Sequence, residues 1–395
     1  MRPADRFGSR PFGWVVGFVA AVTTVLALFA PSASAGPVSP RSPGTPNPGT
    51  SNHLDAVSAL SAKDVWAVGS TDQSTLIVHW NGSVWTRVAG PSPGTDGELT
   101  GVSAVSAADV WAVGSYEVPC DVGAKRETLI LHWNGKAWSK VSTPNPGACD
   151  NELNAVSADS STDAWAVGSY AVEGVDRTLA LHWNGKAWAR VASPNTKGFS
   201  NVLYGTSADS STDAWAVGAR FENAACYCTV TLHWNGKSWN RVPSPSPGSA
   251  GSQLDAVSAD SSKDAWAVGW QNPGAANYKT LILRWNGMHW SPVSSPNPNA
   301  SGPDVLLGVS VRSAGDAWAV GEYTDPTHGS EQDALILHWN GSSWSAVPSP
   351  VAPAANEALS GASATSGTNA WAVGQYRSPL RTLGLRWNGA TWSKT

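Results

Sequence analysis

The chain has 395 residues, of which 14% are charged, and its formal net charge is −4. A mildly acidic chain with scattered Lys and Arg lacks the basic surface that attracts nucleic acids and anionic membranes, so we expect neither as a partner. Length alone would suggest two or three domains, but an internal repeat replaces that estimate.

The first 35 residues have the features of a secretory signal peptide. Arg2, Arg6 and Arg10 precede an apolar run over residues 12–30, and Ala33-Ser34-Ala35 matches the small-residue pattern of a cleavage site. We therefore expect a secreted, extracellular protein cleaved after Ala35. Because the apolar run is long, the alternative is an uncleaved signal that anchors the protein in the membrane. No other segment is long enough to span a bilayer.

Residues 36–52 are rich in Pro, Ser and Gly, which predicts an extended N-terminal segment rather than a packed element.

Four cysteines are present, and an exported protein permits disulfides. Cys120 and Cys149 fall in two loops of one repeat, whereas Cys226 and Cys228 share a third loop. Of the possible pairings, Cys120–Cys149 with Cys226–Cys228 needs the least rearrangement. A Cys-x-Cys metal site is the alternative. No His or second Cys pair stands at metal-site spacing, so we expect no metal or other cofactor.

A segment of about 50 residues occurs seven times over residues 53–395. Its pattern is L-x-(A/G)-V-S-A, a polar gap, D-(A/V)-W-A-V-G, a variable loop, and T-L-x-L-H-W-N-G-x-x-W-x-x-V-x-S-P. The repeats begin at Leu54, Leu99, Leu153, Leu203, Leu254, Leu306 and Leu359.

Each repeat contains three tryptophans. The first set is Trp66, Trp111, Trp165, Trp215, Trp266, Trp318 and Trp371. The second set is Trp80, Trp133, Trp183, Trp234, Trp285, Trp339 and Trp387. The third set is Trp85, Trp138, Trp188, Trp239, Trp290, Trp344 and Trp392.

Each repeat is predicted to form four short antiparallel strands. In the first repeat, Leu54, Ala56 and Ser58 should face one side of the first strand, with Asp55 and Val57 on the other. Residues 61–64 have turn chemistry, and 65–69 and 76–80 form the next two strands. Asn81-Gly82 predicts a two-residue type I′ hairpin. Trp85 and Val88 belong to the fourth strand, which residues 91–94 end.

Seven such units predict an all-β, seven-bladed β-propeller, because a single blade cannot bury its tryptophans alone. The last repeat stops at residues 392–395 without the S-P-x-P-G tail of the others, and residues 42–49 resemble that tail. We therefore expect the N- and C-terminal ends to pair at the outer edge of one blade and close the ring. An open solenoid is the alternative.

These motifs resemble tectonin-type propeller repeats, in which a V-x-W-x-V strand precedes a W-D-G-x-x-W hairpin. They also resemble a Trp-rich repeat of exported proteins from high-GC Gram-positive bacteria. The likeness covers nearly all of residues 53–395, although these repeats are longer than tectonin units and carry Asn in place of the turn Asp. It implies sugar binding or surface recognition without catalysis. Asp-box and kelch propellers are more distant likenesses, because the Asp box and the kelch double glycine are absent.

Two polar arrays are predicted to belong to the framework rather than to a site. One strand position carries His79, His132, His182, His233 and His338, with Arg284 and Arg386 in the other two repeats. Another carries Asp64, Asp109, Asp163, Asp213, Asp264 and Asp316, with Asn369 in the last repeat. A cation already replaces the histidine in two repeats, and equivalent positions on different blades lie too far apart to share a metal ion.

Function is expected where the repeats differ. The connections between the second and third strands, and between repeats, vary in length and should share one face of the disc. Aromatic candidates for ligand binding on that face are Tyr116, Tyr170, Phe221, Trp270, Tyr323 and Tyr376. Polar candidates at the channel entrance are Asp55, Glu98, Glu152, Tyr204, Asp255 and Glu357.

The leading hypothesis is a secreted, monomeric, non-enzymatic recognition protein that binds carbohydrate, a cell-surface glycan or a cell-surface protein. One alternative is a glycoside hydrolase or polysaccharide lyase with carboxylates at the channel mouth. Another is a protein-interaction scaffold. No catalytic residues are assigned, because the chain contains no G-x-S-x-G, H-E-x-x-H, P-loop or EF-hand motif.

Overall fold

A computed structural model describes residues 44–120, 123–221, 227–274, 277–299, 302–325, 331–351 and 356–395. The chain divides into Met1–Arg41 and a compact unit, Ser42–Thr395. The predicted signal peptide and the beginning of the 36–52 segment lie outside the described residues. Within those residues, the structure contains no helix long and apolar enough to cross a membrane.

The compact unit consists of seven four-stranded antiparallel sheets, each made of four consecutive strands. The first three blades are β1 (Asn52–Ser61), β2 (Asp64–Thr71), β3 (Ser74–Trp80), β4 (Trp85–Arg87); β5 (Thr95–Ser106), β6 (Asp109–Cys120), β7 (Gly123–Trp133), β8 (Trp138–Lys140); and β9 (Asn151–Ser160), β10 (Asp163–Val172), β11 (Val175–Trp183), β12 (Trp188–Val191). The fourth and fifth are β13 (Ser200–Ser210), β14 (Asp213–Phe221), β15 (Tyr227–Trp234), β16 (Trp239–Arg241); and β17 (Ser252–Ser261), β18 (Asp264–Gln271), β19 (Lys279–Trp285), β20 (Trp290–Pro292). The last two are β21 (Asp304–Ser313), β22 (Asp316–Thr324), β23 (Gln332–Trp339), β24 (Trp344–Ala346); and β25 (Glu357–Ser366), β26 (Asn369–Arg377), β27 (Leu380–Trp387), β28 (Trp392–Lys394).

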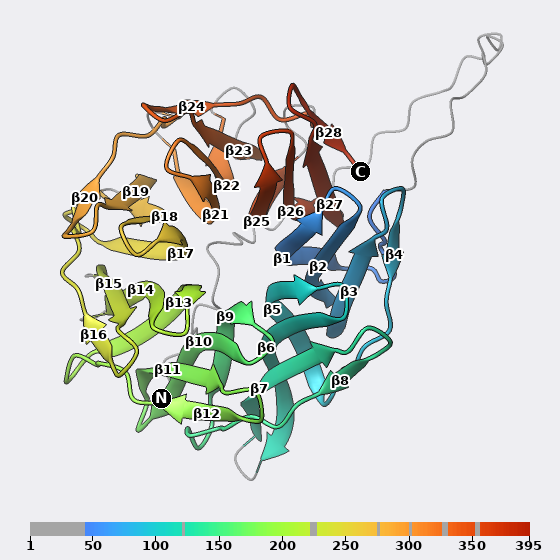
Figure 1. The fold of residues 1–395 in the computed structure, drawn as a ribbon, viewed down its shortest axis with the longest axis vertical. Helices are drawn as coiled ribbons and strands as arrows, with labels where there is room; N and C mark the ends of the chain where they lie inside the picture. The colour runs from blue at the N-terminus through green and yellow to red at the C-terminus, as the bar shows by residue number, and fades with distance from the viewer. Residues whose placement is uncertain are drawn as a thin grey trace, which may run out of the picture. The chain divides into compact units, whose positions relative to one another are not determined.

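The blades are arranged in a closed ring (Figure 1). The first strand of each blade is innermost and contacts the first strands of both neighbouring blades, including β1 with β25. The predicted seven-bladed propeller is therefore confirmed.

The glycine of W-A-V-G is required by the register between the first two strands. Gly69 pairs with Leu54, and a Cβ on Gly69 would lie 2.1 Å from the carbonyl oxygen of His53. The backbone of the first strand lies so close to Gly69 that no side chain fits at this position.

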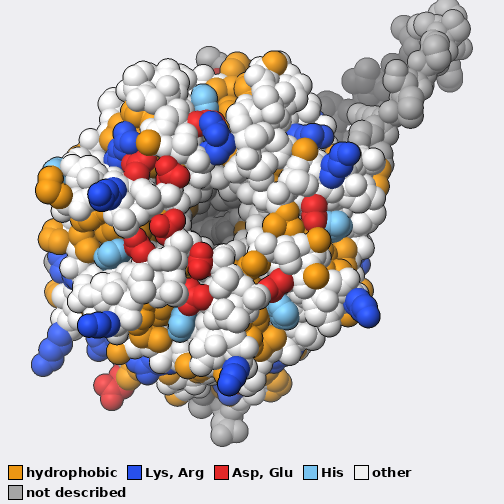
Figure 2. Space-filling view, in the orientation of Figure 1, with side chains coloured by type: hydrophobic (Ala, Val, Ile, Leu, Met, Phe, Trp, Pro, Cys, Tyr) orange, Lys and Arg blue, Asp and Glu red, His pale blue; other side chains and the backbone are white. Residues whose placement is uncertain are grey.

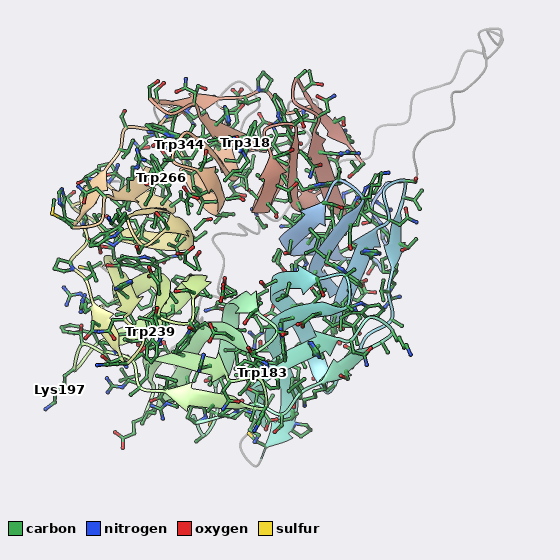
Figure 3. All side chains as sticks on the ribbon, viewed as in Figure 1. Trp183, Lys197, Trp239, Trp266, Trp318 and Trp344 are labelled. Carbon is green, nitrogen blue, oxygen red and sulfur yellow. The ribbon has the colours of Figure 1, made fainter. Side chains whose placement is uncertain are left out.

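Tryptophan packing joins each blade to the next. Trp66 is 2% exposed, and its ring centroid lies 5.1 Å from that of Trp133 and 5.3 Å from that of Trp138 in the second blade. Trp138 meets Trp66 edge-on at 82°, a favourable arrangement for aromatic rings. An equivalent triad recurs at every interface between blades. Trp266 and Trp344 in Figure 3 belong to the triad between the fifth and sixth blades.

The serine of V-S-A forms a second link between blades. Its hydroxyl oxygen accepts a hydrogen bond from a backbone N–H of the following blade at 2.9–3.0 Å, and seven such bonds encircle the ring. The acceptor serines are Ser58, Ser103, Ser157, Ser207, Ser258, Ser310 and Ser363.

The predicted type I′ hairpin is wrong. Trp80 pairs with Trp85, so the loop has four residues, 81–84, and only Gly82 among them has a positive φ, at 97°. The side chain of Asn81 instead accepts hydrogen bonds from the backbone N–H groups of Ser83 and Val84 at 3.0 and 3.1 Å. The turn is therefore stabilised by the Asn81 side chain and not by two residues of positive φ.

The His and Asp arrays are part of the framework, as predicted. His132 Nε2 lies 2.7 Å from Asp109 Oδ1, and its ring stacks on Trp111 at 4.2 Å. In the fifth blade Arg284 donates to Asp264 at 2.7 Å and covers Trp266 in the same way. His and acidic side chains recur around the face of the ring seen in Figure 2.

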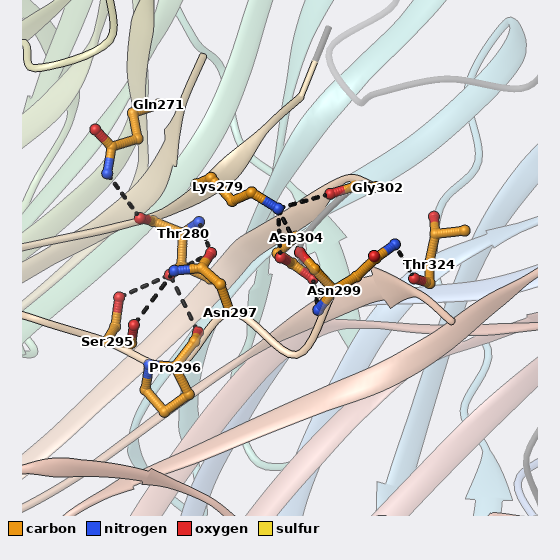
Figure 4. Close-up of polar contacts among 10 residues, drawn as sticks. All are labelled: Gln271, Lys279, Thr280, Ser295, Pro296, Asn297, Asn299, Gly302, Asp304 and Thr324. Carbon is orange, nitrogen blue, oxygen red and sulfur yellow. Dashed lines mark hydrogen bonds and ion pairs between the residues drawn. The ribbon is translucent and has the colours of Figure 1, made fainter. Parts of the chain in front are cut away.

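In the first five blades, the turn that follows the fourth strand accepts a hydrogen bond from the backbone of the third strand. In the fifth blade the backbone N–H of Thr280 donates to Asn297 Oδ1 at 2.8 Å, and its hydroxyl lies 2.7 Å from that of Ser295 (Figure 4). In the seventh blade, Thr382 makes the corresponding bond to Asn47 Oδ1 at 2.7 Å. Near the same point, Trp85 Nε1 donates to the Thr395 hydroxyl at 2.9 Å. The two ends therefore meet as predicted, through a turn segment and without exchange of a strand.

Candidate functional site

The face with variable connections carries the predicted binding residues. The β1–β2 connection and its equivalents always have two residues, whereas the β2–β3 and β4–β5 equivalents differ from blade to blade. We call the face formed by these differing connections the loop face.

The four predicted tyrosines do not converge on the loop face. Tyr116, 5% exposed, packs between the first and second blades, and Tyr170, 8% exposed, packs between the second and third. Tyr323 and Tyr376 pack against two further interfaces, between blades five and six and between blades six and seven. Each ring therefore occupies its own gap between blades.

Charged side chains cover several of these rings. The Lys140 ammonium lies 4.2 Å from the centre of the Tyr116 ring and 2.5 Å from its hydroxyl. Arg190 covers Tyr170 at 4.6 Å and donates to its hydroxyl at 2.5 Å. These contacts favour a packing role for Tyr116 and Tyr170.

The fourth and fifth blades hold a continuous series of aromatic rings, which we call the aromatic row. Phe221 meets Tyr227 edge-on at 4.5 Å, Tyr227 lies 5.6 Å from Trp270, and Trp270 meets Tyr278 at 4.9 Å. Trp270 is buried, and the other three rings are half-buried. The row therefore runs without a break from Phe221 in the fourth blade to Tyr278, which directly precedes β19 in the fifth.

Phe221 and Trp270 were predicted from the sequence, whereas Tyr227 and Tyr278 were not. A signal was present, because both missed tyrosines stand two residues before the threonine that starts the apolar part of the third strand, Thr229 or Thr280. Counting forward from the W-A-V-G glycine hid this equivalence, since the intervening loops differ in length.

Tyr204 lies close to the aromatic row and to several carboxylates. Burial, and then the nearby carboxylate of Asp255, raise the pKa of the Tyr204 hydroxyl well above its ordinary value. Burial also raises the pKa of Tyr227 and of Tyr278. All three hydroxyls therefore remain protonated at neutral pH and can both donate and accept hydrogen bonds.

The polar candidates at the channel entrance fall into distinct strand positions. Asp55, Tyr204 and Asp255 occupy the bulge that follows the leading leucine of the first strand. Glu98 and Glu152 precede that leucine and pair with the second strand. The candidates therefore do not form one ring of carboxylates.

Two of the bulge residues are held by neighbours on their own strand. Asp55 lies 3.2 Å from His53 Nε2, and Asp255 accepts a hydrogen bond from Gln253 at 2.6 Å.

Glu98 and Glu152 converge on one arginine that sequence analysis missed. Arg126 Nη1 lies 3.1 Å from Glu98 Oε1 and 3.1 Å from Glu152 Oε1, and Arg126 Nε lies 3.8 Å from Glu117. We call this group the Arg126 clamp; it joins the second and third blades. Burial alone would lower the pKa of Arg126, but the carboxylates raise it. Burial raises the pKa of Glu152 despite the arginine.

Two carboxylates are buried at the starts of β21 and β25. Asp304 is fully buried and lies 3.2 Å from the Lys279 ammonium, which also donates to the carbonyls of Asn299 and Gly302 (Figure 4). Burial raises the pKa of Asp304 to about 6, although Lys279 opposes the change. Glu357 is 1% exposed, and burial raises its pKa to about 7.

The predicted Cys120–Cys149 disulfide is not formed, and both residues are free thiols. Cys120 pairs with Gly123, whereas the Cys149 carbonyl accepts a hydrogen bond from the N–H of Arg126. Three residues of strand separate these points, roughly 10 Å, which exceeds the Cα separation a disulfide allows. Cys226 lies outside the described residues, so its predicted bridge to Cys228 stays a prediction.

No protein-family model matches the chain, and none of the curated proteins compared with it shows significant sequence similarity. Solved propellers are similar in structure. YCF48 bound to D1 peptide is 15% identical with a TM-score of 0.53, and the match covers 86% of this chain and 93% of that one. YCF48 from Cyanidioschyzon merolae is 14% identical with a TM-score of 0.54, covering 87% and 98%.

A polysaccharide lyase, PL25 ulvan lyase bound to -[GlcA(1-4)Rha3S]-, is 10% identical with a TM-score of 0.55, and the match covers 88% of this chain and 95% of that one. At such low identity these similarities establish the fold alone. The chain is a Trp-rich β-propeller, and its predicted membership of the tectonin type stays a prediction.

Proposed function

We propose that this protein is a secreted, non-enzymatic recognition protein that binds a glycan through its loop face. The aromatic row carries the proposal. Sugar rings present apolar C–H faces that stack on aromatic side chains, and their hydroxyls need nearby hydrogen-bonding groups. The row offers four rings in series, two of which, Tyr227 and Tyr278, carry protonated hydroxyls.

The Arg126 clamp favours binding over hydrolysis. Two carboxylate oxygens that share one nitrogen at 3.1 Å lie at most about 6 Å apart, near the spacing of a retaining glycosidase pair. The guanidinium, however, fills the space between them that a glycosidic bond would need. A hydrolase or lyase using Glu98 and Glu152 remains the second candidate because the two residues do converge.

Binding is tested with the chain from Gly36 onward on a glycan array, followed by calorimetry with the glycans that bind. The double variant Tyr227→Ala/Tyr278→Ala is expected to weaken binding by about tenfold or more, since each lost ring contact contributes about 0.5–1.5 kcal/mol. Tyr376→Ala is the matched control, because this half-buried tyrosine lies in another blade with Lys394 5.5 Å from its ring centre.

Absence of glycan binding, or full binding by the double variant, would contradict the proposal. A folded protein that binds only polypeptides would support the scaffold alternative. Turnover of a polysaccharide that Glu98→Gln or Glu152→Gln abolishes would support the enzyme. Secretion is checked by sequencing the N-terminus of the protein recovered from culture medium, which we expect to begin at Gly36.

A further inference from the structure

The turn site of the seventh blade is filled by a segment from the other end of the compact unit. In the third blade, for example, Asn195 belongs to the turn after β12 and accepts the hydrogen bond of Thr178 N–H at 2.9 Å. In the seventh blade Asn47 accepts that of Thr382, and Gly44 lies beside Thr395, whose backbone oxygen would be 4.0 Å from a Cβ on Gly44. The segment therefore takes the place of the turn without a peptide bond to the blade it completes.

Contacts to this segment are specific in their hydrogen bonding. The hydroxyls of Thr45 and Thr382 lie 2.8 Å apart, and the Thr45 hydroxyl also donates to the Thr382 carbonyl at 3.2 Å. Asn47 Nδ2 donates to the Thr45 carbonyl at 2.9 Å, which fixes the bend that presents Asn47 Oδ1 to Thr382. The backbone N–H, the carbonyl and the hydroxyl of Thr382 each form a hydrogen bond with residues 45–47.

Shape adds to this selectivity. Thr45 is 6% exposed and fits against Gly384, where a Cβ would lie 2.8 Å from Thr45 Cγ2. The equivalent position is Ile77, Ile130, Ala180, Thr231, Ile282 or Ile336 in the other blades. The prolines at 46 and 48 restrict the backbone, so the segment loses little entropy when it binds. We call Thr382, Gly384 and their surroundings the Thr382 clasp.

The second half of the segment is attached to the first blade instead. Asp72 Oδ1 accepts hydrogen bonds from the Thr50 hydroxyl at 2.7 Å and from the N–H groups of Thr50 and Ser51 at 3.0 Å. These bonds lower the pKa of Asp72, so its carboxylate stays ionised at neutral pH. Residues 45–47 can therefore leave the clasp while residues 50–52 stay anchored.

We propose that the Thr382 clasp is a peptide-binding site for the neutral sequence Thr-Pro-Asn-Pro-Gly, and that residues 44–49 of a second copy can occupy it. Exchange of an identical element between copies needs no new contact. In the unaltered chain the anchored segment has a high effective concentration at its own clasp, so the monomer dominates. This site is distinct from the aromatic row and does not depend on the proposed glycan binding.

The test uses the full chain with Thr45→Ala/Asn47→Ala, which weakens the chain's own segment. A fluorescent peptide with the sequence of residues 42–52 is titrated, and binding is followed by anisotropy. We expect saturable binding to this variant and at least about tenfold weaker apparent binding to the unaltered chain. A peptide carrying the Asn47→Ala change should bind about tenfold more weakly, because it loses the hydrogen bond from Thr382 N–H and the internal bond to the Thr45 carbonyl.

Thr382→Val introduced into the same variant should abolish peptide binding, whereas Thr128→Val, at the equivalent turn site of the second blade, should not change it. A melting curve by circular dichroism shows that each variant is folded. No peptide binding to the folded double variant, or equal binding after Thr382→Val, would overturn the peptide site.

Exchange between copies is tested with two complementary chains. The Thr382→Val chain has an intact segment 44–49 and a damaged clasp. The Thr45→Ala/Asn47→Ala chain has a damaged segment and an intact clasp. Light scattering should detect a complex of the two chains in the mixture that neither forms alone. Absence of that complex would overturn occupation of the clasp by a second copy.

Discussion

The serine of the repeated V-S-A segment has a role that its position on a strand does not reveal. Ser207, in the first strand of the fourth blade, accepts a hydrogen bond from the N–H of Ala259 in the fifth blade at 3.0 Å. A second bulge, which follows Ala259 in the fifth blade and Ala208 in the fourth, breaks the pairing of the first strand with the second strand there. The serine thus satisfies a backbone donor of the neighbouring blade and sets the distance between the two blades.

Ser207→Ala should lower the free energy of unfolding by about 1–2 kcal/mol, because the Ala259 N–H loses its partner at the interface. Urea denaturation measures this change. Ser83→Ala, at an exposed hairpin position, is the control and should change stability by less than about 0.5 kcal/mol. Equal effects of the two substitutions would show that the interblade bond contributes nothing.

At the scale of the element, the start of the first strand is a buried polar position. Asn52, Asn151 and Asn201 use their amides there to bind the preceding turn; Asn52, for instance, accepts from Gly49 N–H at 2.9 Å and donates to its carbonyl at 2.8 Å. An amide does this without charge. Asp304 and Glu357 occupy the same position with carboxylates, and Lys279 compensates only the first of them.

The unfolding free energy should therefore depend on pH through Glu357. Its folded-state pKa of about 7 lies above the ordinary value of 4.5, so the folded state holds a proton that the unfolded state has released between these two pH values. Stability should fall by about 2–3 kcal/mol as pH rises from 4.5 to 7 and then level off.

Glu357→Gln should remove this part of the pH dependence and stabilise the protein at pH 8. Chemical denaturation at a series of pH values measures the effect, with Glu173→Gln as the exposed control. An unchanged pH profile in Glu357→Gln would contradict the assignment.

At the scale of the whole molecule, the ring makes all seven interfaces between blades equivalent. Trp371 of the last blade packs on Trp80 and Trp85 of the first at 5.3 and 5.6 Å, much as Trp215 packs on Trp285 and Trp290 at 4.9 and 5.0 Å. In an open array a terminal interface could separate independently, whereas in a closed ring no interface can open without disturbing the others.

Trp371→Phe and Trp215→Phe should therefore destabilise the protein by similar amounts, about 1–3 kcal/mol each, through loss of buried ring contacts. The two variants should unfold in single transitions with similar denaturant slopes. A much smaller effect of Trp371→Phe, or a separate early transition in that variant, would indicate that the closing interface is weaker than the others.

The blade count, the strand order and the framework could all be predicted from the repeat. The Trp, His and Asp positions recur in the same motifs of successive repeats, and in six blades the Asp contacts the His or Arg of its own blade, so the repeat was sufficient to predict them. The complementary ends were predicted for the same reason, since residues 42–49 repeat the turn that other blades carry. The hairpin type was wrong because the Asn81 side chain, rather than the backbone, forms that turn.

The contacts among the non-repeating residues could not be predicted in this way. The predicted tyrosines share a sequence position, which places each in a separate gap between blades and keeps them apart. Arg126 joins Glu98 and Glu152 from two blades, and the aromatic row joins Phe221 to Tyr278 across loops of unequal length. A repeat fixes what lies at equivalent places in successive blades, but contacts between non-equivalent residues depend on how the ring brings neighbouring loops together.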